Sequence, residues 1–357
     1  MNPFRHRKNV GESTLTLRLW EFTGSAILNL VIFLLLAAYL SPLVYMFVTS
    51  VKTPEQLGNS AAPLYPATNP QYSYNGQDYP IMVVPTQDGI HEWAMITPRR
   101  TYADFIDPQD PGRGLIHWIG NWYGLKKAYH FSVTFKNFQD VWNFAHIPQV
   151  MLNTLIVAGI SEIGVLLSSI AVAYGFSRFR IPGGKWLFFL LIATILIPDS
   201  ITLIPTYVIF TRILGWNGTW LPLIVPHFFS SAIFVFLLRQ NFKSIPRDLD
   251  EAAMLDGAGP LRILAWIIIP QSIPVIATVA LLHFFYIWNE LRAASLYLGT
   301  RPDLRTISFA IQTSQTFLFT PEHLEASALV VLIVPVVVLF AFQRFFMHDM
   351  VVTGQEK

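Results

Sequence analysis

Apolar residues along this chain gather in six runs, each about as long as a helix that crosses a ~30 Å hydrocarbon layer. Polar and charged segments separate the runs, which lie at 26–48, 150–177, 186–210, 219–238, 265–289 and 325–346. Prolines inside these runs predict that several of the helices are kinked: Pro198, Pro226, Pro270, Pro274 and Pro335. The predicted fold class is therefore an all-α polytopic membrane protein with six transmembrane helices.

The composition agrees with a membrane protein and excludes other classes. Hydrophobic residues make up 53% of the chain and charged residues 13%, and the mean hydropathy is +0.46. A net charge of +2 leaves no basic surface typical of nucleic-acid binding, so membrane lipid is an expected partner and nucleic acid is not. Because the chain has no cysteine, disulfides, thiolate metal sites and cysteine nucleophiles are excluded.

The distribution of Lys and Arg predicts the orientation. Six spans place both termini on one side, and that side carries thirteen of the 24 basic residues, whereas the opposite short loops carry four. The positive-inside rule then places segment 1–25 and the tail 347–357 in the cytoplasm of a multi-pass inner-membrane protein. The first run, 26–48, is too long and follows too polar a leader to be a cleaved signal peptide, so it is interpreted as an anchor.

The long segment 49–149 is predicted to be an extracytoplasmic insertion that contains a small β-meander. Two hairpin signals, Asn75-Gly76 and Asp88-Gly89, are flanked by residues that alternate between apolar and polar. Several aromatic residues follow, at Trp118, Trp122, Tyr123 and Tyr129. One interpretation is that these rings form a surface that binds a sugar or docks a binding protein. The other is that they form the core of a small module without cysteine, and this second interpretation is preferred for most of the rings.

A polar, acidic segment lies between the fourth and fifth runs: "SIPRDLDEAAMLDGAGPLRILAWIIIP", residues 244–270. Pro246 is expected at the first position of a short helix, acidic residues crowd its first turns, and Gly257 is expected to end it. Pro260 starts a second helix that continues into the fifth run. One face carries Ile245, Leu249, Ala252 and Ala253, which suits a partner's groove. The alternative is a connector that lies on the lipid headgroups, although such helices usually carry Lys or Arg.

This segment resembles the EAA loop of ABC-importer permeases. The matching positions are Glu251, Ala252, Ala253, Gly257, Ile269 and Pro270. The flanking stretches, the "WNE" that ends the fifth run and the C-terminal "FQRFFMHDMVVTG" are similar to the carbohydrate-uptake branch, in particular the maltose-system G permease family. The resemblance covers 150–357 and the first run, with the permease core at 150–346 and its EAA loop at 239–264. The insertion 49–149 is longer than that family usually carries.

The resemblance implies half of a sugar channel rather than an enzyme. Such a permease pairs with a second permease, in a heterodimer here, and two ATPase subunits hold ATP and Mg²⁺, while an extracytoplasmic sugar-binding protein delivers the solute. The implied coupling residues are Glu251, Ala252, Ala253, Asp256, Gly257 and Pro270. No cofactor is expected on this chain, because its one Gly-Lys pair, in "RIPGGKW", lacks the first glycine and the Ser or Thr of a phosphate-binding loop.

Polar residues at membrane depth are candidates for the substrate path. Glu162 and Asp199 lie near the middle of runs, where an ionisable residue costs ~2.5–3.5 kcal/mol on insertion scales, so both should face protein or water. Trp288, Asn289 and Glu290 gather at the end of the fifth run, and amides, carboxylates and aromatic rings suit sugar hydroxyls and pyranose faces. The alternative role for these groups is to bond neighbouring helices.

Two other function classes compete with this interpretation. A secondary transporter or ion carrier would use Glu162, Asp199, His227 and His283 as ion or proton groups. It would need no cytoplasmic EAA helix, and the Gly and Pro positions show no inverted repeat. A membrane-embedded enzyme would need a paired acid and base or a His-rich motif, and the sequence offers neither.

Overall fold

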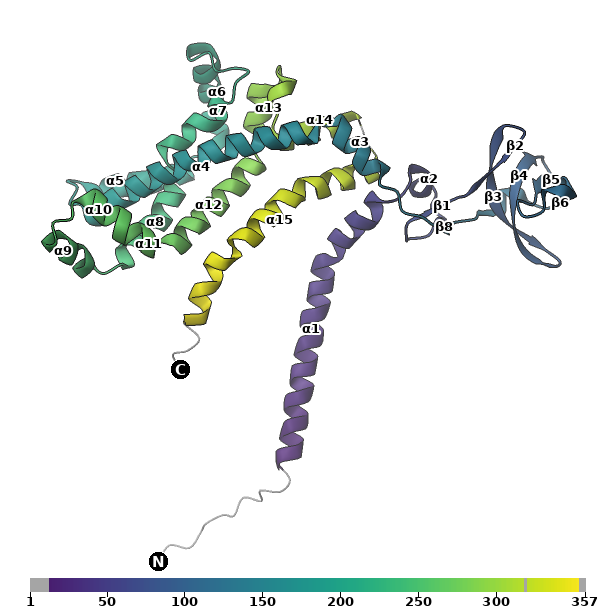
Figure 1. Ribbon diagram of the computed structural model, residues 1–357, viewed down its shortest axis with the longest axis horizontal. Helices are drawn as coiled ribbons and strands as arrows, with labels where there is room; N and C mark the ends of the chain where they lie inside the picture. The colour runs from purple at the N-terminus through teal and green to yellow at the C-terminus, as the bar shows by residue number, and fades with distance from the viewer. Residues whose placement is uncertain (1–12, 318–319, 353–357) are drawn as a thin grey trace, which may run out of the picture. The chain divides into compact units, whose positions relative to one another are not determined.

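The structure is a computed structural model that describes residues 13–317 and 320–352; for 13–23, 199, 317 and 346–352 it describes the backbone alone. The chain divides into two compact units, 1–135 and 136–357 (Figure 1). The predicted cytoplasmic segment 1–25 and tail 347–357 therefore lie partly outside the described residues. The insertion was expected to end at 149, but the structure groups residues 136–149 with the second unit.

The first unit begins with a long apolar helix, α1 (Ser13–Ser50), which contains the predicted span 26–48. Its part suited to cross a membrane is Gly24–Ser50, and the most apolar 18-residue window of that part is not buried within the chain, whereas Thr49 and Ser50 at its end are. A helix that is apolar on all sides and uncovered is suited to lipid or to a neighbouring subunit. The short helix α2 (Pro54–Leu57) follows, and the Gln56 side chain fixes the next loop by donating to Pro63 O and Tyr65 O.

The rest of the first unit is the expected β-module. A six-stranded antiparallel sheet has the order β2-β3-β4-β5-β6, with β7 on the β2 edge of β3, and β1 pairs with β8 in a separate ribbon. The strands are β1 (Ala67–Thr68), β2 (Gln71–Tyr74), β3 (Gln77–Thr86), β4 (Gly89–Pro98), β5 (Tyr102–Ile106), β6 (Ile116–Ile119), β7 (Lys126–Lys127) and β8 (His130–Phe131). Short 3₁₀ turns lie at Pro111–Arg113 and Trp122–Gly124.

Both predicted hairpins are present. Asn75 and Gly76 form the first turn with positive φ angles of 52° and 79°, as a type I′ turn requires. The second turn lies one residue earlier than predicted, because Thr86 pairs with Gly89 and leaves Gln87 and Asp88 as the turn.

The aromatic residues of this module divide between core and surface. Val84, Ala103 and Phe105 are fully buried in one cluster of the module. Trp118 and Trp122 pack against this core, and the Trp118 indole donates to Pro85 O. Tyr123, in contrast, is 77% exposed. The core interpretation therefore holds for the two tryptophans, and a few exposed rings remain for a partner.

The second unit is a helical bundle around α4 (Ile147–Arg178), which contacts α8, α12, α14 and η5. The other helices are α3 (Lys136–Phe144), α5 (Gly184–Ala193), α6 (Asp199–Val208), α7 (Leu221–Ile224), α8 (Ala232–Ser244), α9 (Arg247–Leu255), α10 (Pro260–Ile263), α11 (Ile269–Gln271), α12 (Ile273–Trp288), α13 (Arg292–Leu298), α14 (Ile307–Phe317) and α15 (Pro321–Val352). Short 3₁₀ or π segments are η3 (Thr194–Leu196), η4 (Ile209–Ile213), η5 (Val225–Phe229), η6 (Leu264–Ile268) and η7 (Pro302–Leu304).

Among the described residues, four helices are long and apolar enough to cross a membrane, or up to six if two bent pairs each count as one span. The bent pairs correspond to the predicted third and fifth spans. The third bends by 97° between Gly184–Leu196 and Ser200–Ile213, and the fifth bends by 80° between Pro260–Gln271 and Ile273–Trp288. Prolines near both breaks remove backbone donors, so kinks predicted from sequence are sharp bends in the structure.

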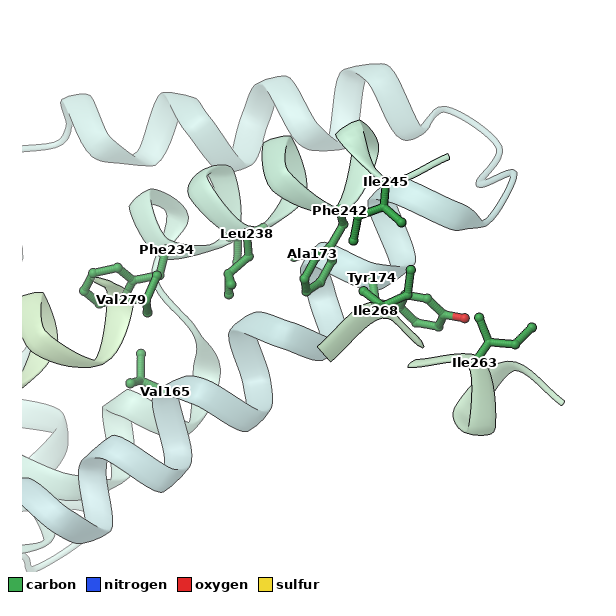
Figure 2. Close-up of a cluster of buried hydrophobic side chains, with 11 residues drawn as sticks. Val165, Ala173, Tyr174, Phe234, Leu238, Phe242, Ile245, Ile263, Ile268 and Val279 are labelled. Atoms are coloured by element: carbon green, nitrogen blue, oxygen red, sulfur yellow. The ribbon is translucent and has the colours of Figure 1, made fainter. Parts of the chain in front are cut away.

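The largest buried cluster joins α4, α8 and the segment after α9. Figure 2 shows Leu238 and Phe242 of α8 gathered with Ala173 of α4 and with Ile263 and Ile268. Small residues let other elements approach α4 closely: a Cβ added to Gly164 would lie 2.5 Å from the Phe228 ring. This close approach of η5 brings the His227 side chain of that segment to the bundle interior.

Candidate functional site

The elbow is the segment 245–263 that joins α8 to the fifth span. Pro246 is the N-cap of α9, so the helix starts one residue later than predicted, and Asp248 and Asp250 lie in its first turn, where the helix dipole favours anions. At its other end the Gly257 N–H donates to Met254 O and the Ala258 N–H to Ala253 O, the two bonds of a Schellman cap. The φ of +81° at Gly257 explains why glycine is needed there.

A buried ion pair fastens α9 to the bundle. Arg178, the last residue of α4, places its Nε 2.7 Å from Asp250 Oδ2, and both side chains are less than 10% exposed. The Arg178 guanidinium also donates to Ile245 O, and Arg247 donates to Ser177 O. Sequence reasoning treated Asp250 only as a helix-start residue and missed this partner, which lies 72 positions earlier in the chain.

The side of α9 away from this ion pair is open. Leu249, Met254 and Leu255 are 41%, 57% and 90% exposed, and Glu251, Ala252 and Asp256 are exposed as well. The prediction that Ile245, Leu249, Ala252 and Ala253 share one face for a partner is wrong in part. Ile245 precedes the helix and is buried in the core cluster, and Ala253 packs partly against the same cluster. Pro270, the last predicted coupling residue, lies outside the elbow in α11 and is exposed.

A second site is a cavity of about 780 Å³ where α12 ends. Its wall comes from α6, α7, η5, α12, α13 and α14, and it combines aromatic rings with polar groups. The polar members include Thr206, His227, Asn289, Glu290 and Gln312. This volume lies in the usual range of small-molecule pockets. Burial and, next, Tyr207 raise the pKa of the Tyr297 phenol, which is also in the wall.

The candidate path residues fall in different places. Asn289 and Glu290 line the cavity; the Asn289 amide donates to Phe285 O, and a Glu290 carboxylate oxygen accepts from the Ala293 N–H at 2.8 Å and so caps α13. Trp288 is fully buried, and its indole donates to Val331 O, so it packs in the core rather than on the cavity wall. Asp199 begins α6 at the bend of the third span, and its side chain lies outside the described residues.

Glu162 belongs to a buried row of polar side chains, which we call the relay. Glu162 Oε2 lies 2.8 Å from His283 Nδ1, and His283 Nε2 lies 3.1 Å from His227 Nδ1. His283 is 1% exposed, and His227 reaches the cavity wall. Within the part of the chain that the structure describes, no group of three His, Cys, Asp or Glu side chains is arranged to hold a metal. The relay is instead a linear chain of hydrogen bonds.

Most residues of the cavity wall escaped the sequence analysis, Thr206 and Gln312 among them. Thr206 and Gln312 are ordinary polar residues in amphipathic helices, and they approach the cavity from segments more than 100 residues apart. The loop that follows α13 is fixed to the bundle by Asn153, which donates to Asp303 O and Arg305 O, and by the Trp220 indole, which donates to Leu304 O.

A helical bundle with several membrane-length helices, an exposed elbow and a polar cavity defines a membrane transport subunit. Residues 164–352 match the family model of the binding-protein-dependent transport system inner membrane component, and the chain belongs to this family. It is thus a membrane-embedded permease subunit of an ATP-driven importer that works with a binding protein and an ATPase. ATP hydrolysis takes place on a separate subunit, and this chain is not an enzyme.

Characterised relatives and a solved structure agree with this family. The chain is 31% identical over 235 residues to the osmoprotective compounds uptake permease of Synechocystis sp., covering 65% of this chain and 77% of the relative. It is 30% identical over 230 residues to the melibiose/raffinose/stachyose import permease of Bacillus subtilis, covering 63% and 82%. A bacterial ABC transporter for alginate import shares the fold, with a TM-score of 0.59 at 17% identity over the full length of both chains.

Proposed function

We propose that this permease carries a sugar or a similarly hydroxyl-rich solute and forms half of the translocation pathway, with a second, similar permease as the other half. The name of one relative supports this solute class, since that permease imports melibiose, raffinose and stachyose. The cavity supports it too. Amide, carboxylate, hydroxyl and imidazole groups beside Tyr286 and Tyr297 suit hydroxyls and the apolar face of a sugar ring.

The observation that carries the proposal is the elbow. It combines a rigid attachment, through the buried Arg178–Asp250 pair, with an exposed helix that bears Glu251, Met254 and Leu255. An exposed apolar helix fixed to the bundle is suited to lie in a groove of a partner protein. In this proposal the partner is one of two ATPase subunits, which hold the ATP and Mg²⁺. The elbow and both termini then face the cytoplasm, and the insertion faces the binding protein.

Reconstituted transport tests the proposal. The chain is co-expressed with the partner permease and the ATPase, placed in proteoliposomes, and supplied with its binding protein and with radiolabelled maltose, melibiose, raffinose or methionine. We expect uptake of at least one sugar that depends on ATP and on the binding protein, and none of methionine. Uptake of methionine alone would reject the solute class, and uptake without the ATPase would revive the ion-coupled alternative.

A further inference from the structure

The relay connects the interior of the bundle to the wall of the cavity. Glu162 comes from α4, His283 from α12 and His227 from η5, so three elements meet through two hydrogen bonds of 2.8 and 3.1 Å. The Phe234 ring lies edge-on to the His283 ring at 6.0 Å, and the Tyr286 ring flanks His227 at 6.1 Å. Buried polar side chains in a membrane protein are costly, and helix packing alone does not require two histidines in series.

With Glu162 ionised and both rings neutral, the order of the atoms determines what His227 can do. An ionised Glu162 accepts the Nδ1–H of His283, so a neutral His283 has an acceptor at Nε2. That acceptor takes the Nδ1–H of His227, and a neutral His227 then carries a lone pair at its own Nε2. Among the described residues, His227 Nε2 has no hydrogen-bond partner. The two hydrogen bonds therefore set the tautomer of both rings and leave Nε2 of His227, a residue of the cavity wall, as an acceptor.

We propose that His227 contacts the transported solute and determines specificity, by accepting a hydrogen bond from one solute hydroxyl at Nε2. Glu162 and His283 are positioning residues that hold His227 in the tautomer with Nε2 unprotonated. The inference rests on the proposed function, since a sugar supplies hydroxyl donors. It adds a named contact and a direction of hydrogen bonding, and it explains why an acidic residue lies deep in α4.

A pair of amide substitutions separates solute contact from structural support. The amide of asparagine overlies the Nδ1 side of an imidazole, whereas the amide of glutamine reaches the Nε2 position. His227→Asn therefore keeps a partner for His283 but removes the group available to the solute, and His227→Gln offers an amide oxygen near the Nε2 position. His227→Ala removes both.

The measurement is uptake of a transported sugar and of its series of single deoxy analogues, in proteoliposomes with saturating binding protein and ATP. In the wild type we expect one analogue to be transported about tenfold more slowly than the parent, the factor expected for one lost hydrogen bond of about 1.4 kcal/mol. His227→Asn and His227→Ala should transport that analogue as fast as the parent, and His227→Gln should restore part of the discrimination.

The positioning residues are tested in the same assay. Glu162→Leu removes the acceptor that orients His283 and should abolish the discrimination, while Glu162→Gln retains a carbonyl acceptor and should reduce it only in part. Glu325→Gln, a matched change on α15 away from the relay, should leave the profile unchanged. An analogue profile in His227→Asn identical to that of the wild type overturns the inference while sugar uptake upholds the proposed function. If the wild type transports no sugar, both are rejected.

Discussion

At the scale of single residues, the Arg178–Asp250 pair illustrates how a buried charge is tolerated. Taking two ions out of water is costly, and their attraction offsets that cost only when both remain in place. Oδ1 of Asp250 has no hydrogen-bond partner among the described side chains and backbone groups, so the ion pair is its main compensation. Removing one residue of the ion pair is therefore expected to lower the stability of the fold more than removing both.

Asp250→Ala should destabilise the second unit by about 3–5 kcal/mol, because it leaves the Arg178 guanidinium buried and unpaired. Thermal unfolding of the detergent-solubilised complex measures the loss as a lower Tm. The control is Asp248→Ala, an exposed acidic residue in the same helical turn, which should change stability by less than about 0.5 kcal/mol. Equal losses in the two variants would contradict the role assigned to the pair.

At the scale of elements, the elbow offers a direct test of partner contact. A Cβ at Gly257 would meet no atom of this chain within 4 Å, so only its positive φ opposes a side chain there. In the proposed function, an effect of side-chain size at this position then comes from the groove of the ATPase. The alanine variant isolates the backbone strain, which costs about 1 kcal/mol.

Gly257→Arg should leave insertion and assembly intact but uncouple solute-stimulated ATP hydrolysis, with stimulation reduced about tenfold or more. Gly257→Ala, which carries the same strain without the bulk, should keep most of the stimulation. ATP hydrolysis by the reconstituted complex, with and without loaded binding protein, measures both. Normal stimulation in the arginine variant would mean that the elbow does not seat in the ATPase.

The elements that sequence predicts best are those with local signals. Asn75-Gly76 suffices for a hairpin because few residue pairs tolerate two positive φ angles, and runs of about 20 apolar residues suffice for membrane helices. The bends of the third and fifth spans are less predictable, since proline is compatible with both a mild kink and a sharp break. The contact of Arg178 with Asp250, and the placement of Thr206 and Gln312 in one cavity wall, depend on tertiary packing and give no periodic signal in the sequence.

At the scale of the whole molecule, topology can be tested because the chain lacks cysteine. Asp88→Cys, in an exposed turn of the β-module, should react with a membrane-impermeant maleimide in cells whose outer membrane face is accessible. Ser244→Cys, exposed at the end of α8, should react only after the cells are opened. Labelling followed by a gel shift reports both sites. The reverse pattern would overturn the proposed orientation.

The β-module can be removed at a natural junction. Thr68 pairs with His130 in the β1–β8 ribbon, so a two-residue Asn-Gly turn can replace 69–129 and close the chain without disturbing α3. If the module enlarges the landing surface for the binding protein, uptake should fall at low binding-protein concentration and recover in excess. A matched variant, Tyr123→Ser, tests one exposed ring alone. Loss of uptake at every concentration, with the complex still assembled, would place the module in the transport path.

The length of α4 has a mechanical consequence. This helix has 32 residues and is therefore about 48 Å long at 1.5 Å per residue. One end holds the elbow through Arg178, and Asn153 near the other end holds the loop that follows α13, a helix of the cavity wall. A tilt of only about 5° about one end would displace the other by about 4 Å, more than the diameter of a water molecule. A small movement imposed at the elbow is thus large enough to open or close a path for water and solute at the far end.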